Sequence, residues 1–189
     1  MVDTVEQAVY MLLSHIEPGM QDREGLKDTP RRVAKMYKEI YGGYKINVAD
    51  LMTTFTKELG MDEMIVVKDI PFYSTCEHHM VPFFGKAHIG YIPDECIIGI
   101  SKLARIVDVF SRRLQIQERL TEQIANTIEV HLKPLGVIVV VEAEHLCMAA
   151  RGIKKPGSST TTSKITGVFK EKDNLARTEF FSLINRRGK

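Results

Sequence analysis

The 189-residue sequence has no tryptophan, only three cysteines and no long apolar run. No run approaches the roughly 18 residues that cross a bilayer, so we expect no membrane insertion. The start, Met1 to Glu6, lacks the basic and apolar regions of a signal peptide, which predicts a reducing, cytoplasmic location with free cysteines. A net charge of +2 is too small to indicate nucleic-acid binding, which would need a concentrated basic stripe.

Two short segments contain the residues that most often bind metals or take part in catalysis. Cys76 and His79 form a Cys-x-x-His pair, and Cys147 supplies a second thiolate far along the chain. Two cysteines and one histidine are a recognised ligand set of catalytic zinc sites, in which water takes the fourth position. Zinc lowers the pKa of that water to roughly 7, so a hydroxide nucleophile exists at neutral pH. His78 and His145 lie beside these ligands and are candidate proton carriers.

The same residues leave other interpretations open. If His145 joined Cys76, His79 and Cys147, four protein ligands would close the site and the metal would be structural. Thiolate and imidazole also suit several divalent metals, so the ligand set alone does not certify zinc. Cys96 lies in an apolar run, and we expect it to pack in the core.

The first part of the sequence has helical periodicity. Apolar residues predict a helix over residues 5–16, and Thr29 as N-cap, followed by Pro30 at the first helical position, predicts the start of a second helix. From Met64 onward, the spacing of the apolar residues changes to that of strands. We therefore divide the chain into an N-terminal helical region, residues 1–62, and a catalytic domain, residues 63–189.

The predicted catalytic domain combines strands with a helix pair. We expect strands over residues 64–70, 81–92, 137–147 and 159–169, helices over residues 101–113 and 116–132, and a last amphipathic segment over residues 173–185. Pro82, Gly85 and Gly90 interrupt the second strand, which suggests bends, bulges or edge positions. His145 and Cys147, two apart on one strand, should face the same side. This pattern predicts an α+β fold with a mainly antiparallel sheet.

Several ordered blocks carry a family resemblance. They are Ser74–Phe83, Gly99–Arg105, Leu114–Thr121, Glu144–Met148 and, near the N-terminus, Asp28–Ala34. These blocks resemble the successive signatures of the GTP cyclohydrolase I family. They span most of the chain, which makes the resemblance specific.

The resemblance implies a tunnelling fold preceded by an N-terminal helical segment. In this fold, antiparallel sheets with their helix pairs join across subunits into a barrel. The family assembles as a decamer of two pentamers, with active sites at subunit boundaries. Such an assembly agrees with a physical expectation, because a short sheet with exposed edges tends to associate and a closed ring removes those edges.

The resemblance also implies a reaction. It is the zinc-dependent conversion of GTP and water to formate and 7,8-dihydroneopterin 3'-triphosphate, the first step of folate and pterin synthesis. Cys76, His79 and Cys147 match the Zn²⁺ ligands of the family. His78 matches the residue that protonates a purine nitrogen during hydrolysis, and His145 matches a histidine near the imidazole ring and ribose.

Further residues match the family's substrate contacts. Glu118, with Gln117 beside it, matches the position that accepts the donor edge of guanine. By itself, however, Glu118 would be interpreted as an ordinary acidic residue of a first helical turn. The residues that match triphosphate or sugar contacts are Ser101, Lys102, Arg105 and Arg151, with Arg32 and Lys35 as further candidates from a neighbouring chain.

Two other classes of protein remain as alternatives. A closed zinc module would keep its metal and organise a binding surface without turning over GTP. A related tunnelling-fold enzyme, such as a pterin synthase or the nitrile reductase of queuosine synthesis, would have a different metal or nucleophile pattern. The pairs His145 with Cys147 and Gln117 with Glu118 argue against these related enzymes.

Overall fold

The computed structural model describes residues 4–19, 22–171 and 175–185. The chain forms two compact units that divide between Gly42 and Gly43, earlier than the boundary expected at residue 62. The difference arises because the segment after Gly42 is attached to the larger unit. The Arg113 side chain donates a hydrogen bond to the Gly43 carbonyl, and β1 (Thr54–Thr56) pairs with β4 (Cys96–Ile98).

The smaller unit consists of α1 (Thr4–Ile16), α2 (Glu24–Lys27) and α3 (Thr29–Ile40). Both helices expected from the sequence are present. The N-cap of α3 is Asp28 rather than Thr29, so Thr29 and Pro30 are the first helical residues. Proline is favourable there because the first N–H groups of a helix have no intrahelical acceptor.

The larger unit contains most of the secondary structure. From Gly42 onward, beside β1 and β4, the elements are η2 (Gly42–Lys45), η3 (Val48–Leu51), β2 (Ile65–Cys76), β3 (Pro82–Ile92), α4 (Ile100–Ser111), β5 (Leu114–Gln115), α5 (Gln117–Leu132), β6 (Gly136–His145), α6 (Leu146–Ala149), β7 (Ser159–Ile165), η4 (Gly167–Lys170) and α7 (Leu175–Asn185). Asp173 of the predicted last segment lies outside the described residues. No helix in the described part of the chain is long and apolar enough to cross a membrane.

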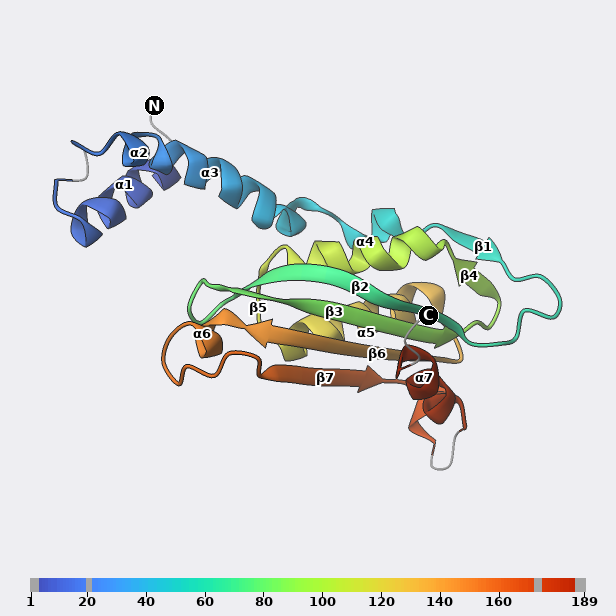
Figure 1. The fold of residues 1–189 in the computed structure, drawn as a ribbon. Coiled ribbons are helices and arrows are strands. Elements are labelled where there is room, and N and C mark those ends of the chain that lie inside the picture. Colours follow the sequence, from blue (N-terminus) through green and yellow to red (C-terminus); the bar gives the residue numbers. More distant parts are fainter. Residues whose placement is uncertain (1–3, 20–21, 172–174, 186–189) are drawn as a thin grey trace. The chain divides into compact units, whose positions relative to one another are not determined.

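A five-stranded sheet forms the centre of this unit. Its strand order is β5-β2-β3-β6-β7, and only the short β5 pairs in parallel. The helices α4 and α5 lie along one face (Figure 1). The predicted α+β fold class, with a mainly antiparallel sheet and a helix pair, is confirmed.

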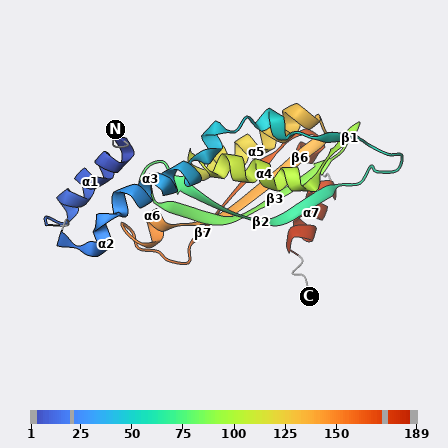
Figure 2. The same ribbon diagram turned by 90° about the horizontal axis from the view of Figure 1, so that it is seen from above.

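Strand β6 is buried on both faces, which explains its continuous apolar run. Val137, Val139 and Val141 pack in the main core with α4 and α5. Ile138 and Val140 point to the opposite face, where they pack in a second core that includes Phe180 of α7. Helix α7 therefore covers one end of the sheet (Figure 2), and Cys76 and His145 lie at the other end, where β2 and β6 finish.

The glycines of β3 mark neither a bulge in this strand nor an edge position, since β3 lies between β2 and β6. Strand β3 pairs with β6 without a register shift, and the irregularity lies in β2, between Val67 and Ile70. A Cβ atom on Gly85 would come within 1.8 Å of the Glu142 carbonyl oxygen, and one on Gly90 within 2.7 Å of Phe180. These glycines therefore permit close packing.

Candidate metal centre and adjoining pocket

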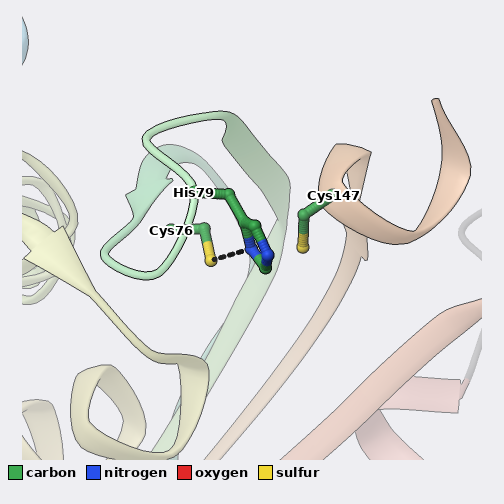
Figure 3. A group of neighbouring side chains, drawn as sticks. All are labelled: Cys76, His79 and Cys147. Carbon is green, nitrogen blue, oxygen red and sulfur yellow. Dashed lines mark hydrogen bonds between the residues drawn. The ribbon is translucent and has the colours of Figure 1, made fainter. Parts of the chain in front are cut away.

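A tight turn at the end of β2 brings two candidate ligands together. The Met80 N–H donates to the Cys76 carbonyl over 2.8 Å, and Met80 has a positive φ of 54°. This turn reverses the chain, so His79 folds back toward Cys76 and its Nδ1 lies 3.8 Å from Sγ (Figure 3). His78 occupies the same turn and is exposed.

The third candidate ligand comes from α6. We expected His145 and Cys147 on one strand, and this was wrong, because β6 ends at His145 and the chain turns into α6 at Leu146. The helical turn directs the two side chains to different neighbours. The ligand atoms of Cys76, His79 and Cys147 all lie within 4.8 Å of one another, as Figure 3 illustrates.

This donor group has the composition and spacing of a metal site. Two sulfurs and one imidazole nitrogen fit a tetrahedral ion that keeps one open position. Among the described residues, His145 does not join the group, because its Nε2 lies 2.7 Å from the Gln117 side-chain oxygen. The arrangement therefore fits the open, three-ligand interpretation better than the closed one.

Electrostatics at the two thiols also favour a cation. Burial raises the pKa of Cys147, and the neighbouring Cys76 raises it further, while Arg151 acts in the opposite direction. Without a cation, the Cys147 thiol therefore resists ionisation. A bound metal ion reverses this preference, because its charge stabilises both thiolates.

The imidazole ring of His145 has a defined orientation. Its ring stacks on Phe83 with 4.7 Å between ring centres and 2° between planes. Burial lowers the pKa of His145, whereas the negative charge of Glu118 acts in the opposite direction. Gln117, which bonds to the ring, is only 1% exposed.

An ion pair connects the Cys76–Met80 turn to α5. Two nitrogens of Arg119 donate to the two carboxylate oxygens of Glu77 over 2.5 and 3.0 Å. The Arg119 guanidinium lowers the pKa of Glu77. Because Glu77 adjoins Cys76 and Arg119 adjoins Glu118, this two-bond contact sets the position of the turn relative to the first turn of α5.

A pocket of about 230 Å³ opens beside the donor group. Seven predicted site residues line it, namely Cys76, His78, His79, Gln117, Glu118, His145 and Cys147. The remaining lining residues are Gln115, Ile116, Met148 and Thr160. A candidate metal site, two histidines and a carboxylate therefore face one cavity, as hydrolysis of a polar ligand would require.

Comparison with known sequences identifies the family. A model of the family described as GTP cyclohydrolase I matches residues 5–185. This chain belongs to the GTP cyclohydrolase I family. It is 53% identical to GTP cyclohydrolase 1 of Brevibacillus brevis over 184 residues, which cover 97% of each chain.

Two other relatives, GTP cyclohydrolases from a bacterium and from Dictyostelium, agree with this assignment. GTP cyclohydrolase 1 of Bartonella quintana is 51% identical over 185 residues, covering 97% of this chain and 89% of the relative. The Dictyostelium discoideum protein of the same name is 51% identical over 183 residues, covering 97% and 78% respectively. A solved archaeosine synthase of the QueF-like type covers 55% of this chain and 93% of its own, with a TM-score of 0.47 and 17% identity.

Four residues that match the family's triphosphate or sugar contacts do not line this pocket. Ser101 and Lys102 lie in the first turn of α4 and Arg105 one turn later, whereas Arg151 lies in the turn after α6. Helix α4 has 12 residues and is therefore about 18 Å long. Its far end leads into β5, which pairs with Cys76. Ser101 and Lys102 thus begin the helix at the end remote from the metal centre.

The sequence did not indicate several residues that hold the site residues in place. Phe83 and Arg119 fall inside the blocks that resemble the GTP cyclohydrolase I family, but nothing about their residue types indicated a stacking or ion-pair role. Thr160 falls outside those blocks. Its carbonyl reaches the pocket wall because β7 pairs with β6, with Thr160 opposite Ala143. Such a contact depends on the register between two strands, which no short stretch of sequence indicates.

Proposed function

We propose that this chain hydrolyses GTP to formate and 7,8-dihydroneopterin 3'-triphosphate, the first step of folate and pterin synthesis, in the cytoplasm. The single observation that carries the proposal is the convergence of the Cys76, His79 and Cys147 donor group with Glu118 in one pocket. Membership of the GTP cyclohydrolase I family and the names of its relatives support the choice of substrate.

Cys76, His79 and Cys147 hold Zn²⁺ in this proposal. When bound, zinc supplies a nucleophile at neutral pH by acidifying water, which suits hydrolysis at C8 of the purine. The chain's own contribution is geometric. The end of β2 and the turn that follows it would supply two ligands and α6 the third, and all three residues line the pocket.

Two histidines at this pocket serve proton transfer. His78 is exposed at the tip of the turn and protonates the purine nitrogen next to C8 as the ring opens. His145 is held more rigidly, stacked on Phe83, and faces the imidazole and ribose part of the substrate. The different surroundings of the two side chains suit different steps of the reaction.

Glu118 selects guanine. Its carboxylate lies in the first turn of α5 and lines the pocket. One carboxylate can accept hydrogen bonds from both N1–H and the exocyclic amine of guanine, a donor pair that adenine does not offer. Gln117 was matched to the same edge, but its side chain is buried and bonded to the protein.

The triphosphate site requires more than one subunit. The part of α4 that is remote from Cys76 contains Ser101, Lys102 and Arg105. We propose that these residues serve the pocket of a neighbouring subunit, where they act together with the Arg151 of that pocket. This arrangement accords with a tunnelling fold for residues 63–189 and a decamer of two pentamers with active sites at subunit boundaries. Within the described residues β7 is an edge strand, and pairing of such edges between subunits would close the ring.

A direct assay tests the proposed function. The purified full-length chain, loaded with zinc, should release formate from GTP and develop pterin absorbance. Treatment with a chelator should stop both signals, and added Zn²⁺ should restore them. Bound zinc without either product would favour the alternative of a closed zinc module that only organises a binding surface.

Replacing His78 by alanine should separate proton transfer from metal binding. The variant should keep its zinc and bind GTP, because His78 is outside the donor group, while formate release slows by roughly two to four powers of ten. Zinc by elemental analysis, GTP affinity by calorimetry and formate release are measured on one preparation. His131→Ala, at an exposed histidine in the last turn of α5, is the control. Near-normal formate release in His78→Ala would remove this residue from the catalytic list.

A further inference from the structure

The side chain of Gln117 is fully used by the protein. Its Nε2 donates two hydrogen bonds of 2.9 Å each, to the carbonyl oxygens of Val141 on β6 and Thr160 on β7. An amide NH2 group has two hydrogens, so both donors are engaged. These bonds also determine which way the amide faces, because the reversed amide would place its oxygen against two carbonyl oxygens.

The amide orientation determines the protonation of His145. The Gln117 oxygen lies 2.7 Å from His145 Nε2, and an amide oxygen can only accept a hydrogen bond. His145 Nε2 must therefore carry a hydrogen, whether the imidazole is neutral or charged. The parallel stack on Phe83 holds the plane of the ring, and no described residue hydrogen-bonds Nδ1.

We propose that Gln117 is a positioning residue that holds His145 with its hydrogen on Nε2, so that Nδ1 is the ring nitrogen left to contact the substrate. The inference rests on the proposed function insofar as that substrate is GTP. It replaces the role suggested by the resemblance, in which the Gln117 side chain contacts guanine beside Glu118. Both polar atoms of that side chain already have protein partners.

The first test observes the proton directly. Solid-state NMR of zinc-loaded protein, labelled with 15N at histidine, distinguishes a protonated from an unprotonated ring nitrogen in an assembly of any size. The His145 signals are assigned by their absence in His145→Ala. Above neutral pH, the wild-type protein should show Nε2 protonated and Nδ1 unprotonated. The opposite tautomer in the wild-type protein would overturn the proposal without any variant having to fold.

The second test uses one variant of Gln117 and a matched control. Gln117→Leu removes the acceptor and should release His145 from the single tautomer. Thr121→Val is the control, because Thr121 also joins α5 to β7 through a 2.6 Å contact with Thr162, and its hydroxyl bonds to the backbone carbonyl of Gln117 rather than to the Gln117 side chain or His145. An unchanged tautomer in Gln117→Leu, or the same change in Thr121→Val, would count against a specific role.

A double-mutant cycle then tests whether the positioning of His145 by Gln117 affects the turnover of GTP. Gln117→Leu should lower kcat by roughly 10- to 100-fold with little change in KM, the order of loss seen when a partner that orients a functional histidine is removed. In the His145→Ala background, the same change should cost almost nothing further, because the residue it orients is gone. Losses that multiply would mean that Gln117 acts on GTP independently of His145. If the wild-type protein turns over no GTP, the proposed function fails, while the NMR result still decides the role of Gln117.

Discussion

Replacing Cys147 by serine should remove both the bound zinc and the turnover of GTP. The donor group has three members within 4.8 Å, and a serine hydroxyl does not ionise to replace the lost thiolate. The loss should extend to structure only locally, since Cys147 lies in the short helix α6 and is partly buried at the margin of the main core. Zinc content by elemental analysis and formate release from GTP provide the measurement.

Cys96→Ser is the matched control for this substitution. Cys96 is also a partly exposed cysteine, but it lies on β4 opposite Thr56 and outside the donor group. Its replacement should leave the zinc content and activity close to those of the unmodified chain. Equal loss of zinc from the Cys96 and Cys147 variants would contradict the ligand assignment.

Glu118→Ala should lower kcat/KM for GTP by roughly four to five powers of ten while the zinc content stays unchanged. A site built to pair the polar edge of its substrate loses discrimination of this order when the pairing is removed. The carboxylate is outside the donor group, so the metal should be retained. The specificity constant for GTP is measured on protein whose zinc content is known.

Glu122→Ala controls for the loss of a carboxylate from α5. Glu122 lies one helical turn after Glu118, is exposed and bonds to Lys164 over 2.7 Å. A surface ion pair of this kind contributes little to stability, at most about 1 kcal/mol. The variant should therefore retain activity. If Glu118→Ala kept most of its activity as well, Glu118 would be only an acidic residue at a helix start.

The order and type of the main elements could be predicted from the sequence. Strand β6 illustrates the reason, because its apolar run from Val137 to Val141 is a property of neighbouring residues. The pair Cys76 and His79 could be recognised in the same way, since both ligands belong to one turn. The end of β6 could not, because a strand pattern does not reveal that the chain enters a helix at Leu146, one residue before Cys147.

The sequence by itself determined the α+β class, the cysteines and histidines capable of binding a metal, and the family resemblance. Each of these can be recognised from short stretches of neighbouring residues. The tertiary structure decided which residues meet. It separated His145 from the donor group, placed Phe83 opposite it on the neighbouring strand, and paired Gln117 with its ring. These contacts join segments that are distant in sequence, so they depend on strand register and helix packing, which no local pattern contains.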